Sequence, residues 1–488
     1  MSSLTKNYFY NILGLLTGVL FPFVTFPYVS RVLMPEYLGK ISFVQSLTNY
    51  FITLALLGIP AYGIRELSRA KISKDKNEFS KIFTELLLIS LIASIISFVI
   101  FFILIFQNQK LSVIRELLYI YSFQVVFAFL NLDYFFIALE KHKRRTIRTV
   151  VLRIISLGLI LSLVKVPSDY IKYGIILVFP ELLARIIDIY LCKEYIFLNF
   201  KELKFKKHMR PLFTIFLYVF SVGIYVNLDS TMLGFMKTES EVGLYTTGSK
   251  LVRMIIPIIS ILGTVMAPKI IGYIKNKEKD KIYETIDKFI DFNIIIGVPA
   301  TFLMIYLSKD IILLISGNKF IASDLTMKII SLIIVFLPIG TFFGGQILMP
   351  NDKETIVFKV AITGMICNVT FNFLLIPKFS IEGAAFATTF TEILICLYRG
   401  YEVKKIYLDY NIVTKERINC IGLGFIAFIS IFLLKDMEKE NSFYNVIVFS
   451  FIYGIIYFGG LLLLKDKNVL MFLSKIFIKL KVKKIRRN

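Results

Sequence analysis

Long apolar runs recur along the whole chain and are separated by short polar stretches. Most of these runs are rich in Ile, Leu and Phe over about 20 residues, which as a helix covers a hydrocarbon core of about 30 Å. The run ISLIASIISFVIFFILIF does not alternate polar and apolar residues, as a strand of a membrane barrel would. The pattern therefore predicts an all-α polytopic membrane protein.

Fourteen transmembrane helices are predicted from the positions of these runs. They lie near residues 8–29, 41–60, 83–106, 116–138, 149–165, 171–192, 211–236, 251–273, 289–307, 325–349, 355–377, 382–402, 418–434 and 444–464.

Charged residues in the loops predict the orientation. The loops after spans 2, 4, 6, 8 and 12 are rich in Lys and Arg, as is the tail from Lys465 to Arg487, whereas the loops after the odd-numbered spans hold few. Because Lys and Arg are retained on the cytoplasmic side of a membrane, both termini are predicted to be cytoplasmic.

The longest polar interruption in the first half, residues 193–210, separates six spans from eight. We predict two pseudo-symmetric six-helix bundles, in residues 1–200 and 201–410, followed by residues 411–488 with two C-terminal helices and a basic cytoplasmic tail. The short outer loops after spans 1 and 7 carry similar motifs, PEYLGK and EVGLY. Such an internal repeat is typical of transporter lobes.

Composition agrees with this class: 57% of the 488 residues are hydrophobic, 19% are charged, and the mean hydropathy is +0.73. The net charge of +23 resides in short loops, so it indicates topology rather than nucleic-acid binding. The four cysteines show no CxxC spacing and the chain has two histidines, so no metal site or disulfide framework is predicted.

No sequence motif of a hydrolase or group-transfer enzyme is present: there is no GxxxxGK[ST], HExxH or GxSxG. The predicted outer loops are also too short to hold a catalytic domain. The sequence therefore predicts a carrier rather than an enzyme, without a cofactor, driven by an ion gradient or by the gradient of its substrate.

Polar side chains inside the spans are the informative ones, because a charge at the bilayer centre costs about 2.5–3.5 kcal/mol. In span 6, Glu181, Arg185 and Asp188 lie three or four residues apart, so they can neutralise one another on one helical face. The alternative is that they line a cavity. Further polar residues inside or entering spans are Asp133, Arg153, Asn227, Asp229, Lys250, Arg253, Asn368, Asn372, Glu392 and Arg399.

Asp229 in span 7 lies far from both ends of its span. It needs a partner on another helix, a hydrated lumen or a proton. It is a candidate ion-coupling site, and an interhelical anchor is the alternative. Asn368 and Asn372 share a face of span 11 and suit either helix–helix hydrogen bonds or sugar hydroxyls. Lys250 and Arg253 suit a pyrophosphate or a solvated rim.

Several stretches resemble the Wzx-type polysaccharide (O-antigen repeat-unit) flippases of the multidrug/oligosaccharidyl-lipid/polysaccharide exporter superfamily. They are PYVSRVLMPEYLGKISFVQSLTNYF, LGIPAYGIRELSRAK, NLDYFFIALEKHKRRTIR, YVNLDSTMLGFMKTESEVGLYTTGSKLVRM, LPIGTFFGGQILMPNDKE and NVTFNFLLIPKFSIEGAAFATTFTE, which follow one another in residues 27–392.

This resemblance implies that undecaprenyl-pyrophosphate-linked oligosaccharide units cross the bacterial cytoplasmic membrane by alternating access, with H⁺ or Na⁺ antiport. It implies membrane lipids, a polysaccharide polymerase and a chain-length regulator as partners. Candidate lumen or gate residues are then Arg31, Asp133, Asn227, Asp229, Lys250 and Arg253, with Asn368, Asn372 and Glu392 added from their positions in spans.

Other functions remain open at the level of sequence. Within the superfamily they are a lipid II flippase and a multidrug exporter, although a drug exporter usually has twelve spans. The short outer loops disfavour a membrane polysaccharide polymerase or ligase. Asp229 inside a span disfavours a non-transporting scaffold.

Overall fold

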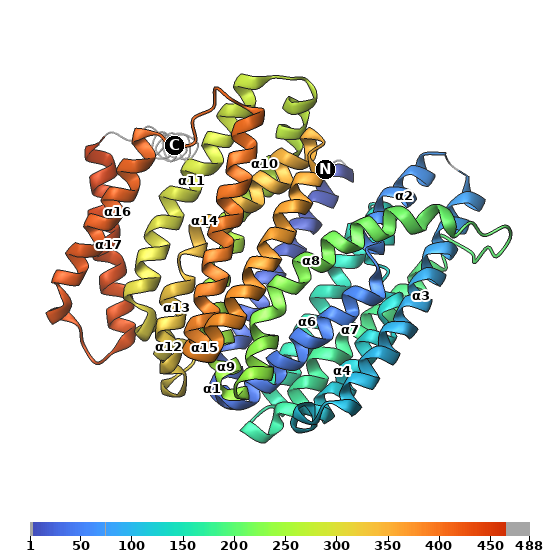
Figure 1. Cartoon of the computed structure of the whole chain (residues 1–488), viewed down its shortest axis with the longest axis horizontal. Coiled ribbons are helices and arrows are strands. Elements are labelled where there is room, and N and C mark those ends of the chain that lie inside the picture. Colours follow the sequence, from blue (N-terminus) through green and yellow to red (C-terminus); the bar gives the residue numbers. More distant parts are fainter. Residues whose placement is uncertain (1–2, 74, 465–488) are drawn as a thin grey trace, which may run out of the picture. The chain divides into compact units, whose positions relative to one another are not determined.

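The structure is a computed structural model that describes residues 3–73 and 75–464. Within these ranges the chain is helical and has no β-strand, which confirms the predicted all-α class (Figure 1). The basic tail predicted from Lys465 to Arg487 lies outside the described residues.

The helices of the first half follow one another with short connections. They are α1 (Ser3–Leu56), α2 (Ile59–Ser73), α3 (Lys76–Gln107), η1 (Gln109–Ile114), α4 (Arg115–Val126), η2 (Ala128–Leu130), α5 (Asp133–Ala138), α6 (His142–Leu163), η3 (Pro167–Asp169), α7 (Tyr170–Cys192), α8 (Lys206–Met236) and α9 (Glu239–Arg253).

The second half continues the same pattern. Its elements are α10 (Ile256–Lys275), α11 (Lys279–Tyr306), α12 (Ser308–Ile315), η4 (Asn318–Ser323), α13 (Asp324–Ile330), α14 (Ile333–Phe342), the π-helical η5 (Phe343–Leu348), η6 (Met349–Asn351), α15 (Glu354–Ile406), α16 (Lys415–Leu433), η7 (Lys435–Met437) and α17 (Ser442–Leu463).

Ten of the described helices are long and apolar enough to cross a membrane, or eleven if the bent stretch from Gln109 to Ala138 is one span. Two of them contain a break, because φ is 64° at Met34 in α1 and 47° at Ser380 in α15, so each has two legs. Helix α7 is also long enough, with 23 residues, but it carries several charges. The arrangement is compatible with fourteen spans, and the chain is a multi-pass membrane protein.

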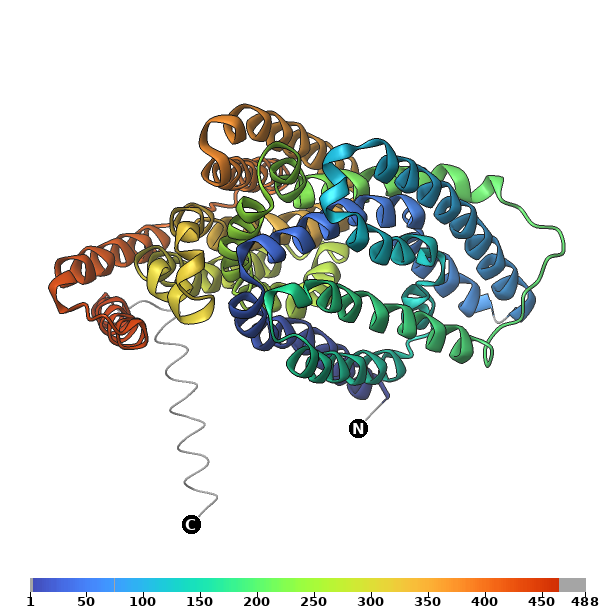
Figure 2. The ribbon, with the colours of Figure 1, turned by 90° about the horizontal axis from the view of Figure 1, so that it is seen from below.

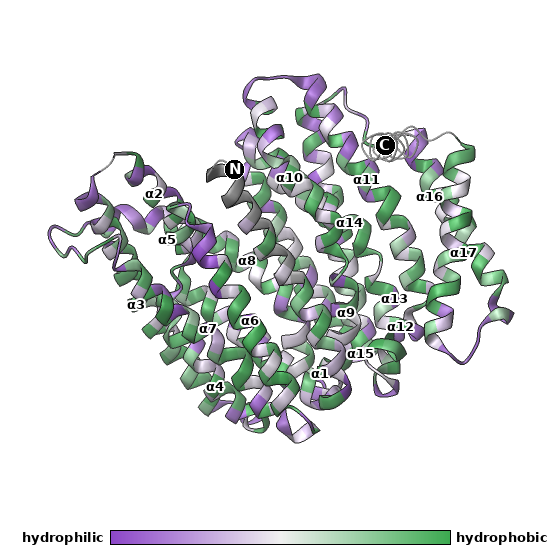
Figure 3. Ribbon diagram, turned by 180° about the vertical axis from the view of Figure 1, so that it is seen from behind, coloured by the Kyte–Doolittle hydropathy of each residue, from purple (hydrophilic) through white to green (hydrophobic). Residues whose placement is uncertain are grey.

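Side chains exposed on the long helices are mostly apolar, for example Ile92, Ile95, Ile96 and Val99 on α3. Figure 3 shows that hydrophilic residues concentrate at helix ends and in loops, and that the middles of the helices are hydrophobic. An apolar exterior of this extent is stable only against lipid.

By its internal contacts the chain forms two compact units. The first comprises residues 1–247 and 361–384, and the second comprises residues 248–360 and 385–488. The domains predicted from sequence, at 1–200, 201–410 and 411–488, remain a prediction about repeated bundles.

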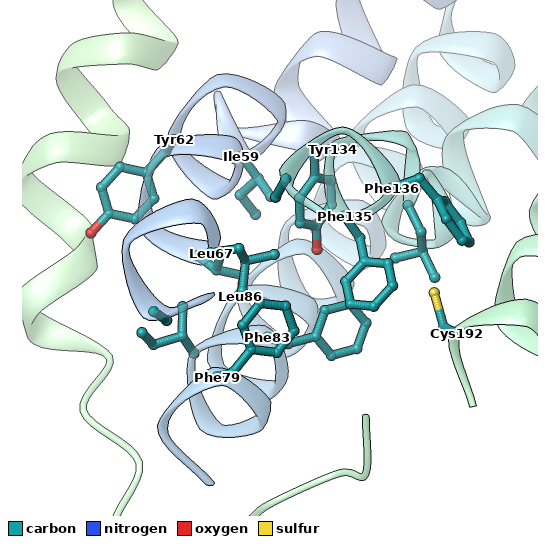
Figure 4. Close-up of a cluster of buried hydrophobic side chains, with 14 of the residues drawn as sticks. Ile59, Tyr62, Leu67, Phe79, Phe83, Leu86, Tyr134, Phe135, Phe136 and Cys192 are labelled. Carbon is teal, nitrogen blue, oxygen red and sulfur yellow. The ribbon is translucent and has the colours of Figure 1, made fainter. Parts of the chain in front are cut away.

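At one end of the first unit, the loops predicted after spans 2, 4 and 6 meet. Aromatic residues of α2, α3 and α5 form a buried cluster there, which Cys192 at the end of α7 completes (Figure 4). The loop between α7 and α8 runs beside α2 and α3 (Figure 2). The backbone N–H of Asn199 in this loop donates a hydrogen bond to the Oγ1 of Thr84 at 3.0 Å. An ion pair between Lys71 and Glu140, 3.2 Å apart, joins the last turn of α2 to the turn between α5 and α6.

The loops predicted after spans 1, 3, 5, 7 and 11 meet at the opposite end of this unit. The ammonium of Lys110 donates to the carbonyl of Lys237 at 3.1 Å, and that of Lys237 donates to the carbonyl of Pro377 at 3.2 Å. The rings of Tyr37 and Tyr170 lie 4.8 Å apart. Within this unit the loops therefore alternate between two ends as predicted; which end is cytoplasmic remains a prediction.

The second unit is organised around α11, which packs on α10, α14 and α16, while α17 packs on α16. The guanidinium of Arg417 at the start of α16 binds Asp287 and Asp291 of α11, the latter at 2.7 Å. This pairing fixes the two C-terminal helices to the helices before them.

Candidate functional site

Asp229 lies at the centre of a buried polar cluster in the first unit. Only 3% of it is exposed. Its carboxylate accepts hydrogen bonds from the Nδ2 of Asn372 at 2.7 Å, from the Nδ2 of Asn368 at 3.5 Å, and from the hydroxyl of Tyr245. Of the options that the sequence left open for Asp229, the structure shows partners on other helices, namely α15 and α9.

The two asparagines lie one turn apart on α15, so their amides reach the same carboxylate. The Nδ2 of Asn372 also donates to the Oδ1 of Asn368 at 3.2 Å. Among the described residues, the buried Oδ1 of Asn372 accepts no hydrogen bond. A carbonyl oxygen beside a carboxylate, left free of donors, is a ligand that a cation can use.

One face of α8 is bound to α1 near this cluster. The Nδ2 of Asn49 donates to the Oδ1 of Asn227 at 3.1 Å, and the hydroxyl of Thr231 donates to Ser46 at 3.0 Å. Hydrogen bonds between spans replace the water that the lipid phase lacks. Asn227 is thus placed as an interhelical contact next to the Asp229 cluster.

Asp133 belongs to a second polar cluster of the first unit. Its carboxylate lies 2.8 Å from a guanidinium nitrogen of Arg148 and 3.3 Å from one of Arg145, both on α6. Arg148 also pairs with Asp188 of α7, of which 3% is exposed. A guanidinium can hold two carboxylates at once because its donors point in several directions.

The charges on α7 are balanced only in part along that helix, where Glu181 and Arg185 attract each other. Asp188 is paired with Arg148 instead. Glu181 accepts from the Nε2 of Gln124 at 2.9 Å, and Arg185 donates to the main-chain carbonyl of Gln124, also at 2.9 Å. These side chains line a cavity, which is the other interpretation that the sequence left open.

The remaining candidates lie on α1, α9 and α15. Arg31 is exposed on α1 before the break at Met34. Lys250 and Arg253 lie in the last turn of α9, where Arg253 donates to Ser249 at 3.2 Å. Glu392 is buried on α15 within the second unit. The structure unites Asp229, Asn368 and Asn372, and their roles in transport remain predictions.

Sequence reasoning missed the partners of these groups: Tyr245, Gln124, Arg145 and Arg148. The two arginines stand in EKHKRRTIR, which was interpreted as a loop because predicted span 5 began at residue 149, whereas α6 begins at His142. The spacing of Arg145 and Arg148 by three residues was a helical signal that could have placed both on one face.

The breaks in α1 and α15 lie at the same end of the first unit as α9. At the start of α9, Thr238 and Glu241 form a reciprocal pair, in which the N–H of Thr238 donates to the Glu241 carboxylate at 2.9 Å and the N–H of Glu241 to the Thr238 hydroxyl at 3.3 Å. The hydroxyl of Ser380, at the break of α15, also donates to Glu241.

The backbones of α1 and α9 touch at two glycines. A Cβ on Gly39 would lie 1.7 Å from the carbonyl oxygen of Glu239, and a Cβ on Gly243 would lie 1.9 Å from that of Pro35. Only glycine permits this approach. The two motifs that the sequence showed as a repeat, PEYLGK and EVGLY, therefore pack against each other.

Comparison with protein families gives a match to the family described as "Polysaccharide biosynthesis protein", over residues 4–273 and thus more than half of the 488 residues. The chain belongs to this family. Its resemblance to Wzx-type flippases is confirmed.

Two relatives illustrate the match. A protein of Shigella dysenteriae described as "Putative O-antigen transporter" is 23% identical over 391 residues, which cover 79% of this chain and 96% of that protein. An uncharacterized membrane protein of Methanocaldococcus jannaschii is 28% identical over 255 residues, and the match covers 49% of this chain and 48% of that protein. The first of these relatives is a transporter by its description, in line with the prediction that the chain is a carrier and not an enzyme.

Among solved structures, the fold is shared with "Lipid II flippase MurJ, inward closed conformation", with a TM-score of 0.70 and 17% identity over 94% of this chain and 98% of that one. At this identity the likeness shows the fold alone.

Proposed function

We propose that this protein flips oligosaccharide repeat units linked to undecaprenyl pyrophosphate from the inner to the outer leaflet of a bacterial cytoplasmic membrane. The observation that carries the proposal is the match to the protein described as "Putative O-antigen transporter" along nearly its whole length, within a polysaccharide biosynthesis family. Both termini are then cytoplasmic, and a polysaccharide polymerase and a chain-length regulator act on the flipped units.

Deleting the gene tests this proposal against a polymerase or ligase. Loss of a flippase leaves single lipid-linked repeat units on the inner face of the membrane, whereas loss of a polymerase leaves them on the outer face. Accumulation on the outer face would overturn the proposal.

A lipid II flippase is the second candidate, because a protein of that description shares this fold. Reconstitution in vesicles separates the two, with one fluorescent lipid-linked oligosaccharide and one fluorescent lipid II. Faster flipping of lipid II than of the oligosaccharide lipid would favour the second candidate. If the protein flips neither lipid but exports a drug, a multidrug exporter is favoured.

We also propose alternating access, with closure of the first unit at the end where α1 and α9 touch. The hydroxyls of Ser42 and Thr246 lie 3.3 Å apart there. Cysteines at both positions, in a chain without its native cysteines, would form a disulfide that holds this end closed. We expect flipping to stop on oxidation and to return on reduction, and the single Ser42→Cys variant to flip under both conditions.

The Asp229 cluster is proposed to couple flipping to H⁺ or Na⁺. A cation or proton that binds a buried carboxylate beside amide oxygens can favour one conformation over another. Reconstituted protein should flip faster when one of the two ion gradients is imposed. Flipping that stays unchanged after Asp229→Ala and Lys250→Ala together would refute the site assignments.

A further inference from the structure

A cavity of ≈ 430 Å³ lies inside the first unit, between α1, α5, α6 and α7, and is separate from the Asp229 cluster. Its size is in the range of sites for small organic molecules. Three cations and three acids line it: Arg148, Arg153, Arg185, Asp133, Glu181 and Asp188. The formal charges of these lining residues therefore cancel, while Arg145, which does not line the cavity, also contacts Asp133.

The ion pairs inside the cavity do not use all of these groups. Arg148 holds both aspartates. Arg153 donates to the hydroxyl of Thr17 at 3.0 Å, and in the described part of the chain it has no carboxylate within ion-pair distance. Arg185 and Glu181 each bind a neutral group of Gln124. Two guanidiniums and one carboxylate thus keep hydrogen-bonding capacity for a ligand.

This combination suits a sugar. Ring hydroxyls donate to carboxylates and accept from guanidiniums, and both kinds of partner are present with the small polar Asn131, Thr149 and Ser156. The apolar Leu152 and Ile176 can cover the C–H face of a ring. A net anion gains little, because the formal charges of the residues that line the cavity sum to zero.

The cavity also lies where a substrate could enter. Asp133 and Arg148 are close to the beginnings of α5 and α6, at the end of the unit where the basic loops meet. Lining residues then continue along α6 to Ser156. A headgroup that enters from the predicted cytoplasmic side would reach Arg153 and Glu181 after passing the paired charges.

We propose that this cavity binds the sugar part of the lipid-linked substrate, and that its balanced charge selects sugars without net charge, either neutral or zwitterionic. The proposal rests on the proposed function, because it assigns a place to the glycan of that substrate.

The test measures the occupancy of the cavity in the full chain in lipid nanodiscs. The four native cysteines are replaced by alanine, Thr149→Cys is introduced, and its labelling by a water-soluble maleimide is timed. The probes are N-acetylglucosamine and glucuronic acid, each linked by pyrophosphate to the same short prenyl chain, and inorganic pyrophosphate alone. We expect the N-acetylglucosamine probe to slow labelling most, and pyrophosphate to have no effect.

Removing an acid from the cavity and removing a cation from it should change the preference between the two sugar probes in opposite directions. Glu181→Gln should shift protection toward the glucuronic acid probe by about tenfold, the size of one hydrogen bond to a charged group, and Arg153→Gln should shift it away. Arg65→Gln on α2, an exposed arginine outside the cavity, is the matched control and should leave the preference unchanged.

Protection by pyrophosphate alone, or the same preference in all variants, would overturn this inference. Flipping of the two probes by the unmodified protein is measured in parallel. If protection follows the charge changes but neither probe is flipped, the proposed function fails and the cavity remains a sugar site; if flipping occurs without protection, the cavity inference fails alone.

Discussion

Asp188 and Asp229 are the same residue type with the same exposed fraction, 3%, in the same unit, yet they are held in opposite ways. Asp188 pairs with the guanidinium of Arg148, whereas Asp229 receives hydrogen bonds from two side-chain amides and a tyrosine hydroxyl.

The comparison shows that burial of a charge does not by itself define a role. The guanidinium of Arg148 pairs directly with Asp188 and lines a cavity with it, an arrangement less suited to exchanging a cation. Amide and hydroxyl donors orient Asp229, and we propose that this arrangement lets a small cation or a proton bind there and leave. Four changes, in order of decreasing effect, test this difference.

Arg148→Met should have the largest effect on folding. It leaves Asp133 and Asp188 without their shared cation, and removing one partner of a buried pair costs about 3–5 kcal/mol. Thermal unfolding in detergent should show a clearly lowered midpoint. Arg69→Met on the exposed side of α2 is the control. An equal fall in the unfolding midpoint of both variants would show that the buried pairing of Arg148 contributes nothing special.

Asp229→Asn should fold normally but lose its response to an ion gradient, because the amide keeps most of the shape and none of the charge. The stimulation of flipping by H⁺ or Na⁺ should fall about tenfold or more. The same substitution at Asp188 should reduce stability and leave the ion response in place. Ion stimulation that survives Asp229→Asn would show that coupling occurs elsewhere.

Gln124→Leu should have a smaller effect, about 1 kcal/mol, since Glu181 loses a hydrogen bond but lines a cavity that water can enter. Gln107→Leu, at the exposed end of α3, provides a matched control. Chemical unfolding would separate the two; identical midpoints would mean that Gln124 does not support Glu181.

Asp169 lies in the turn between α6 and α7 and serves as a carboxylate outside the spans for comparison. Its substitution should have the smallest effect on stability. The ammonium of Lys172 and the N–H groups of Lys165 and Val166 lower the pKa of Asp169 to about 2. Because the folded-state pKa is below the usual value, Asp169 stabilises the fold above pH about 4, and this contribution is lost as the pH falls toward 2. Acid unfolding should be less steep in Asp169→Asn; an unchanged profile would refute this.

The candidate site could be predicted from the sequence only one element at a time. The rule that charges are costly in lipid selected Asp229, Asn368 and Asn372 individually, because each stands inside an apolar run. Nothing in one chain indicates that α8 and α15 place these residues together, since they lie more than a hundred residues apart.

Span 6 shows the same limit. Spacing along a helix predicted that Glu181, Arg185 and Asp188 neutralise one another or line a cavity. Asp188 pairs with Arg148 of α6 instead, and α4 supplies the hydrogen-bond partner of Glu181 and Arg185. Competition between neighbours on one helix and neighbours on another is decided by packing, which local spacing does not describe.

The sequence by itself determined the helical class, the multi-pass topology and the alternation of loops between two ends. These follow from the free energy of transferring each residue to lipid, which is local and additive along the chain. Only the tertiary structure decided that Asp229 is held by amides, that Asp188 is held by an arginine, and that balanced charges enclose a cavity, because such contacts join residues distant in the chain whose meeting depends on how helices pack.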